Sequence, residues 1–240
     1  MGVQPISAGR RRRFARRVVA WYALNGRDLP WRKTTDPYAI VVSEILLQQT
    51  QVRRVIPFYE RFLSTYPTVE ALARAPLEEI RQVTDPLGYK VRGRWLKEMA
   101  LEVAEARSGY FPRTLPELRR LKGVGRYTAG AVMSFAFHED APILDTNVAR
   151  VLTRYFGLQQ ARRPALWALA GDVIPRGEAH RLNQALMDLG AMVCVARRPR
   201  CSTCPVQRGC VTTAGSPPAA ARRRRRAAAS GRSRSRSPQS

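Results

Sequence analysis

Apolar residues recur at helical spacing along nearly the whole chain. No long run alternates between apolar and polar side chains, which is the pattern that a half-buried strand requires. Asp36-Pro37 places a capping carboxylate before a proline at the first helical position, which predicts a helix that continues to about Thr50. Pro116 predicts a further helix that stops at Gly123. The sequence therefore predicts an all-α fold.

The chain carries a large excess of positive charge. Its 240 residues have a formal net charge of +24 and a pI near 11.4, which predicts a polyanionic partner such as double-stranded DNA. Arginine runs in residues 10–17 and 222–236 supply 14 of these charges, so +10 remains for the body. Each run is equally compatible with a solvated tail that binds polyanions without specificity. Residues 216–240 offer too little apolar surface to become ordered, and we expect them to be disordered.

The four cysteines lie close together in the sequence, in the pattern Cys194-x6-Cys201-x2-Cys204-x5-Cys210. No stretch approaches the roughly 20 apolar residues of a membrane span, and no signal peptide is recognisable. We therefore expect a cytoplasmic, nucleoid-associated protein whose cysteines bind metal rather than form disulfides. All-thiolate ligation suits a [4Fe–4S] cluster or a structural zinc ion, and the spacing alone does not separate them.

The segment LPELRRLKGVGRYTAGAVMSFAF indicates a helix, a tight turn and a second helix. Gly123 and Gly125 permit positive φ angles and close backbone approach, so the N–H groups of the turn and of the second helix's first residues can point at one phosphate. Such a hairpin grips DNA independently of its base sequence. An ordinary two-helix corner with a glycine cap would have the same Gly-x-Gly pattern.

Two carboxylates stand out as candidates for catalysis. Glu44 has Ile40, Val41 and Leu47 among its helical neighbours, so it does not lie on a fully solvated face. It is either a structural glutamate or a general acid whose pKa is raised by burial. Asp145 precedes a helical segment and suits the N-cap. An N-cap carboxylate that faces a cleft can also stabilise a cationic transition state.

Several motifs, in order from Trp21 to Cys210, resemble those of adenine DNA glycosylases of the MutY type. They are EILLQQTQV from Glu44, GVGRYTAGA from Gly123, LDTNV from Leu144, MDLGAMVC from Met187 and the cysteine pattern. The wider superfamily includes endonuclease III. The resemblance implies a two-domain helix-hairpin-helix fold with DNA held between the domains, and a [4Fe–4S] cluster bound by the four cysteines.

The resemblance also predicts how the chain is divided. A basic arm comprises residues 1–17, a six-helix barrel with the hairpin comprises residues 31–137, and the tail comprises residues 216–240. Residues 18–30 and 138–215 together form the iron–sulfur domain.

By the same resemblance, Glu44 protonates the base that leaves, and Asp145 stabilises the oxocarbenium-like sugar. Asn147 orients the carboxylates. Tyr127 occupies the position at which endonuclease III has its Schiff-base lysine, so we expect a monofunctional glycosylase. Gln49 and Tyr89 match the residues that fill the base stack when a base is flipped out. The remaining expected DNA contacts are Thr50, Leu87, Gly123, Gly125, Arg126 and Thr128.

The predicted activity is that of a monomer that removes a mispaired base, adenine opposite guanine or 8-oxoguanine, from duplex DNA. Lys90, Asp85-Pro86 and Thr146 depart from the family pattern. The C-terminal domain that reads 8-oxoguanine has no counterpart in the 30 residues after Cys210. A thymine or uracil glycosylase acting on G·T and G·U mismatches is therefore the main alternative. A bifunctional glycosylase with lyase activity and a non-catalytic DNA-binding module are weaker ones.

Overall fold

The computed structural model describes residues 6–214, and all regular structure in that range is helical. This confirms the all-α prediction. The tail at residues 216–240 lies outside the described residues. The α-helices are α1 Ala8–Asn25, α2 Pro37–Leu47, α3 Val52–Thr65, α4 Val69–Arg74, α5 Leu77–Thr84, α6 Val91–Ala106, α7 Leu115–Leu118, α8 Arg126–Phe135, α9 Thr146–Phe156, α10 Arg163–Asp172, α11 Ala179–Asp188 and α12 Val211–Ala214. The short 3-10 helices are η1 Pro30–Arg32, η2 Asp85–Leu87, η4 Cys201–Thr203 and η5 Gln207–Gly209, and η3 Leu189–Val193 is a π-helix.

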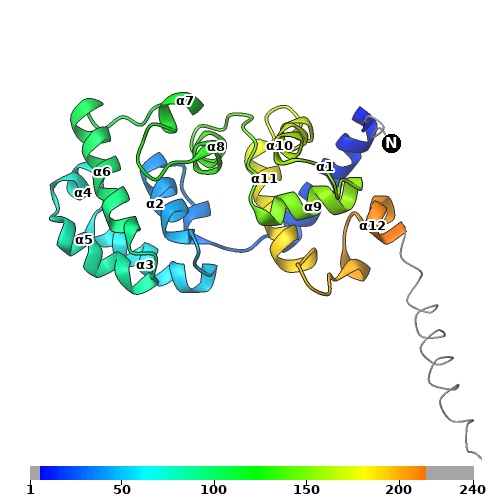
Figure 1. Cartoon of the computed structure of the whole chain (residues 1–240), viewed down its shortest axis with the longest axis horizontal. Helices are drawn as coiled ribbons and strands as arrows, with labels where there is room; N and C mark the ends of the chain where they lie inside the picture. The colour runs from blue at the N-terminus through cyan, green and yellow to red at the C-terminus, as the bar shows by residue number, and fades with distance from the viewer. Residues whose placement is uncertain (1–5, 215–240) are drawn as a thin grey trace, which may run out of the picture.

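The helices form two groups along an elongated molecule (Figure 1). Helices α2 to α7 gather at one end, α1 and α9 to α12 gather at the other, and α8 lies between them. The segments that follow α1 and α8 connect the groups. The domain boundaries given above remain a prediction. No helix in residues 6–214 is long and apolar enough to cross a membrane.

Helix α1, at the start of the described chain, packs against helices from its C-terminal part. The Ser7 hydroxyl caps the helix by accepting from the Arg10 N–H, and Phe14 and Val18 are fully buried. The Phe14 ring lies 4.5 Å from the ring of Tyr155 on α9, measured between centroids. Residues 8–17, which the sequence analysis assigned to a basic arm, are therefore the first half of a packed helix.

Helix α2 is the central helix of the first group. All its residues from Tyr38 to Leu46 are buried, as expected for a helix that is apolar on every side. Asp36 caps it as predicted, with a carboxylate oxygen that accepts from the Tyr38 N–H at 2.9 Å. The helix ends at Leu47, three residues earlier than expected, because the backbone leaves the helical conformation at Gln48, which has ψ 123°. Gln49 follows in a left-handed conformation with φ 55°. Helix α2 thus carries Glu44 into the interior.

The helix predicted to run from Pro116 to Gly123 is shorter than expected. Helix α7 ends at Leu118, and turns cover the rest of the segment. Leu118 and Leu121 are both buried, so the apolar spacing reflects packing of a turn rather than a continuous helix.

Candidate functional site

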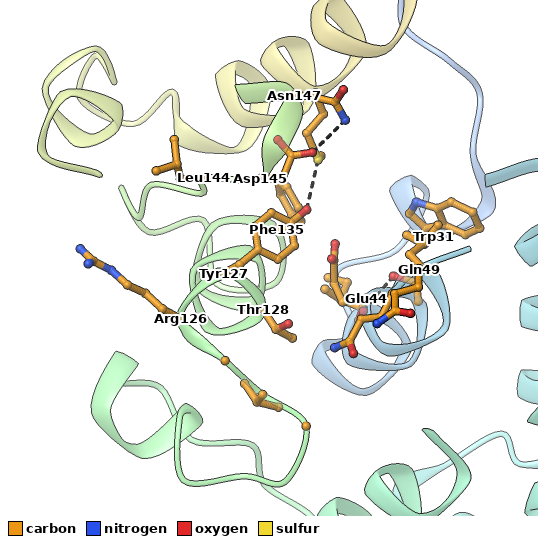
Figure 2. A pocket seen from close by; sticks show the side chains of 18 of the residues that line it. Trp31, Glu44, Gln49, Arg126, Tyr127, Thr128, Phe135, Leu144, Asp145 and Asn147 are labelled. Atoms are coloured by element: carbon orange, nitrogen blue, oxygen red, sulfur yellow. Dashed lines mark hydrogen bonds between the residues drawn. The ribbon is translucent and has the colours of Figure 1, made fainter. Parts of the chain in front are cut away.

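A cavity of about 1190 Å³ opens between α2, α8 and the start of α9. Figure 2 shows Glu44 on one side of it and Tyr127 and Asp145 on the other. The predicted site residues that line it are Glu44, Gln49, Thr50, Gly123, Gly125, Arg126, Tyr127, Thr128, Asp145 and Asn147. Leu87 and Tyr89 are absent from its lining: Leu87 is buried elsewhere, and Tyr89 is 38% exposed.

The Glu44 carboxyl is shielded from solvent and has a perturbed pKa. The residue is only 7% exposed. Burial raises its pKa from 4.5 to about 7, and the negative charge of Asp145 adds to that rise. The nearby Tyr127 hydroxyl and the positive charge of Arg32 act in the opposite direction. A carboxyl that holds its proton near neutral pH is suited to act as a general acid.

Tyr127 lines the cavity on the same side as Asp145. Its hydroxyl donates to the Met187 sulfur at 3.3 Å (Figure 2). Burial, together with the nearby charges of Glu44 and Asp145, raises its pKa well above 10, so the phenol stays neutral. A neutral phenol can hydrogen-bond but is no substitute for an amine that forms a Schiff base.

Asp145 caps α9, as its position in the sequence predicted. One carboxylate oxygen accepts from the Val148 N–H at 2.6 Å and the other accepts from the Asn147 amide at 2.9 Å. The Asn147 side-chain oxygen in turn accepts from the Arg150 guanidinium at 2.6 Å. These bonds fix the carboxylate at the entrance of α9, where the positive end of the helix dipole favours negative charge.

Arg150 connects this site to the cysteine-bearing segment, and the sequence analysis did not single it out. Its guanidinium donates to the carbonyl oxygens of Cys194 and Gly190, both at 2.7 Å. Gly190 packs directly on Asn147, where an added Cβ would lie 2.6 Å from the Asn147 Cβ. Arg150 lies three residues after Asn147 in the sequence, so the two side chains share one face of α9. This spacing is the sequence signal that could have identified Arg150.

A buried ion pair supports the other side of the cavity. Arg32 binds both carboxylate oxygens of Asp188 at 2.8 Å, and Asp188 is fully buried. Although burial acts to raise the pKa of Asp188, the hydrogen bonds and charge of Arg32 lower it. The Arg32 guanidinium is therefore held in place near Glu44. Sequence reasoning missed the pair because the two residues lie on η1 and at the end of α11, far apart in the chain.

The hairpin differs from expectation in one respect. Gly123 has φ 76°, as predicted, and the Trp95 side chain packs against it. Gly125 does not have a positive φ: it is the extended N-cap of α8, with φ −82°. A Cβ at Gly125 would meet no atom within 4 Å, so its backbone faces open space. The following residue, Arg126, stacks its guanidinium on the Trp167 ring at 4.1 Å.

Thr128, expected at the DNA interface, is only 4% exposed, although it lines the cavity.

Thr50 and Gln49 lie in the turn after α2. Gln49 and Tyr89 both adopt positive φ angles, 55° and 43°, which are uncommon for residues other than glycine. Two strained loops therefore present the two residues that were expected to enter the base stack.

The four cysteines come together near α9. Burial raises the pKa of Cys204 to about 11, and the other three thiols add to that rise. The Cys194 sulfur lies 3.5 Å from the Arg154 guanidinium, and the Cys210 thiol donates to the Arg154 carbonyl at 3.4 Å. Within residues 6–214, no three Cys, His, Asp or Glu side chains are arranged to hold a single metal ion.

Residues 42–169 match the family described as HhH-GPD superfamily base excision DNA repair protein. The chain belongs to the HhH-GPD superfamily. The matched region contains Glu44, the hairpin and Asp145, and it ends before the four cysteines.

Among curated relatives, the chain is similar to two kinds of HhH-GPD protein. It is 44% identical over 211 residues to the adenine DNA glycosylase of Rattus norvegicus. This alignment covers 82% of this chain and 41% of the rat protein. It is 36% identical over 215 residues to the thymine-DNA glycosylase of Aeropyrum pernix, covering 86% of this chain and 96% of that protein. The chain thus spans about two fifths of the length of the rat relative.

Solved structures agree with this assignment. A thermostable thymine-DNA glycosylase superimposes with a TM-score of 0.81 at 35% identity, covering 85% of this chain and 96% of that one. An endonuclease III–DNA covalent intermediate superimposes with a TM-score of 0.77 at 24% identity, covering 88% of this chain and 98% of that one. The second likeness supports the all-α fold alone.

Proposed function

We propose that this chain is a monofunctional DNA N-glycosylase that removes adenine mispaired with guanine or 8-oxoguanine. The observation that carries the proposal is the placement of Glu44 and Asp145 on opposite sides of one cavity. The adenine DNA glycosylases to which the chain is similar support adenine as the base removed.

The two carboxyl groups can divide one reaction between them. Cleavage of the bond between base and sugar sends the bonding electrons to the base and leaves positive charge on the sugar. Protonated Glu44 donates its proton to the departing base. The Asp145 carboxylate stabilises the cationic sugar until water adds to the anomeric carbon and loses a proton, leaving an abasic site.

The proposal of a monofunctional enzyme rests on the chemistry of the cavity lining. Lys122 is the only lysine among the described residues that line the cavity. Its ammonium lies 3.8 Å from the Glu98 carboxylate and the side chain is about half exposed, 49%. Tyr127, which faces Glu44, offers no amine. We therefore expect an intact abasic strand as the product.

The main alternative is removal of thymine or uracil from G·T or G·U mismatches. It is favoured by the Aeropyrum pernix relative, a thymine-DNA glycosylase that the alignment covers almost from end to end. Purified protein should be incubated with duplexes containing A·G, A·8-oxoguanine, T·G or U·G, and abasic sites should then be cleaved with hot alkali. Strand cleavage only in the A·G and A·8-oxoguanine duplexes is expected, whereas cleavage at T·G or U·G would favour the alternative.

We also propose that Cys194, Cys201, Cys204 and Cys210 hold a [4Fe–4S] cluster. The donor set fits this group, since the other three thiols all lie near enough to Cys204 to raise its pKa. A zinc site gathers its ligands around one metal, whereas each cysteine of a cubane cluster binds a different iron. The cluster would stabilise the segment that Arg150 and Arg154 bind. Brown protein is expected, and colourless protein with stoichiometric zinc would refute the proposal.

The proposed partner is double-stranded DNA with a mispaired base, bound by a monomer in the nucleoid. The hairpin supports DNA binding because the open backbone at Gly125 and the N-terminus of α8 can meet a phosphate. The net charge of +24 supports it as well.

Each phosphate neutralised adds about 0.9 to the slope of log affinity against log salt concentration. Removing residues 216–240 should reduce that slope on undamaged duplex if the tail contacts DNA.

A further inference from the structure

Arg92, at the start of α6, is the largest fully buried side chain in the described residues. Its guanidinium donates to the Gln48 carbonyl, to the Thr50 hydroxyl at 2.5 Å, and to the Gly88 carbonyl at 3.4 Å. These acceptors lie in two different loops, one after α2 and one before α6. Arg92 therefore joins loops that are about forty residues apart in the sequence.

Each of the two joined loops contains a strained residue. Gln49 lies between the two acceptors of the first loop and has φ 55°. Tyr89 follows the acceptor in the second loop and has φ 43°. The Arg92 guanidinium also lies over the Tyr89 ring, 5.7 Å from its centroid. Residues held in such conformations are strained and persist only where neighbouring contacts enforce them.

No ion pair in the described part of the chain includes Arg92. Burying a cation without a carboxylate partner is costly, and its Nε atom is buried without a hydrogen bond. Methionine or leucine would fill the same volume at lower cost. Packing alone therefore does not explain an arginine at this position. The planar guanidinium explains it, because it can donate hydrogen bonds to two loops at once.

Trp95, one turn further along α6, extends the same support to the hairpin. Its ring packs edge-on against Tyr89, with 5.6 Å between centroids. Its other contact is with Gly123, where an added Cβ would lie 3.1 Å from the Trp95 Cβ. The first turns of α6 thus contact the hairpin and both loops whose residues Gln49 and Tyr89 were expected from the sequence to meet DNA.

We propose that Arg92 is a positioning residue, which holds the Gln48–Thr50 and Gly88–Tyr89 loops in one register so that Gln49 and Tyr89 enter the DNA together at a mispair. The inference rests on the proposed function for the identity of the DNA site. Its direct consequence is discrimination between mispaired and matched duplex. A lysine at this position would keep the charge but could not reach both loops as a planar fork does.

The experiment compares full-length wild type with Arg92→Lys, Arg92→Met and Arg94→Met. Arg94 is the matched control, because it lies two residues further along α6, its side chain is 61% exposed, and it pairs with the exposed face of the same helix through Glu98 at 2.7 Å. Affinity is measured for an A·8-oxoguanine duplex and its matched counterpart. Unstacking is followed by the fluorescence of 2-aminopurine placed beside the mispair.

Both Arg92 variants should lower the ratio of the two affinities, and the fluorescence change, by about tenfold or more, as small misplacements of site residues do. Arg94→Met should leave the ratio unchanged. Wild-type discrimination in Arg92→Lys would show that only charge matters and would overturn the proposal. Retained discrimination in Arg92→Met would overturn it as well.

A milder variant covers the case in which Arg92→Met does not fold, which its melting temperature would reveal. Thr50→Val removes one acceptor of the fork and should reduce discrimination by a few-fold. Combined with Arg92→Lys it should cause little further loss, because both changes remove the same interaction, and full additivity would contradict the proposal. If the wild-type protein discriminates mispairs but excises no base, the glycosylase function alone is refuted. If the wild-type protein does not discriminate mispairs, both the glycosylase function and the positioning role of Arg92 are refuted.

Discussion

Glu44 and Asp145 face the same cavity, but different structural elements hold them in place. Glu44 lies in the middle of α2, whose side chains from Tyr38 to Leu46 are all buried. Asp145 is the N-cap residue immediately before α9, and both its oxygens accept hydrogen bonds. An apolar surrounding favours the neutral acid of Glu44, whereas the hydrogen bonds at Asp145 fix the position of its carboxyl group. Two residues of similar chemistry can thereby take different roles in one reaction.

The largest effect is expected from Asp145→Asn. Loss of the carboxylate should lower single-turnover excision by on the order of 10²–10³, the range seen when a preorganised electrostatic group is removed. Asparagine caps helices about as well as aspartate, so α9 should remain folded. Single-turnover kinetics with duplex affinity as the control would test this. A near wild-type rate would end the assignment of Asp145 as the anion.

Glu44→Gln should lower excision by on the order of 10², in the range of general acid catalysis. The pH profile sharpens the comparison with Asp145. Because the pKa of Glu44 is raised to about 7, the wild-type rate should fall as the pH rises through 7 and the acid ionises. The residual rate of the variant should show no such fall. An unchanged fall in the variant would mean that another group donates the proton.

The same substitution should also stabilise the protein at alkaline pH. The folded-state pKa of about 7 lies above the reference value of 4.5, so the folded protein binds the extra proton between these values. Stability from this group is present below pH 4.5 and is lost as the pH rises through 7. The advantage of Glu44→Gln should therefore grow to on the order of 3 kcal/mol by pH 8. Urea unfolding at pH 5 and pH 8 would measure it, and equal advantages at both would contradict the buried-acid interpretation.

A smaller effect is expected on the Asp145 side from Arg150→Gln. Its guanidinium holds the Asn147 amide that donates to Asp145, so excision should fall by about tenfold through looser positioning. Arg181→Gln is a suitable control, because that side chain is 56% exposed and lies 4.0 Å from Glu178. Equal rates for the two variants would show that Asp145 is held by its helix end alone.

The candidate site was only partly predictable from the sequence. Local patterns identified Glu44 on an apolar helix, Asp145 as an N-cap and Gly123 as a positive-φ turn residue, because capping, helical spacing and glycine conformation depend on near neighbours. Both glycines of the hairpin permit a positive φ, but only Gly123 adopts one, since a Gly-x-Gly pattern does not tell which glycine turns and which begins the helix.

The sequence by itself determined an all-α chain, a strongly basic surface and a set of four thiols, each a property of composition or short-range spacing. Only the tertiary structure decided what surrounds the two carboxylates. Arg32 with Asp188 and Arg92 with two loops are pairings of residues that lie 156 and 44 positions apart. Which residues meet over such separations depends on how the helices pack, and the pKa of Glu44 follows from that packing because burial is a property of the folded chain.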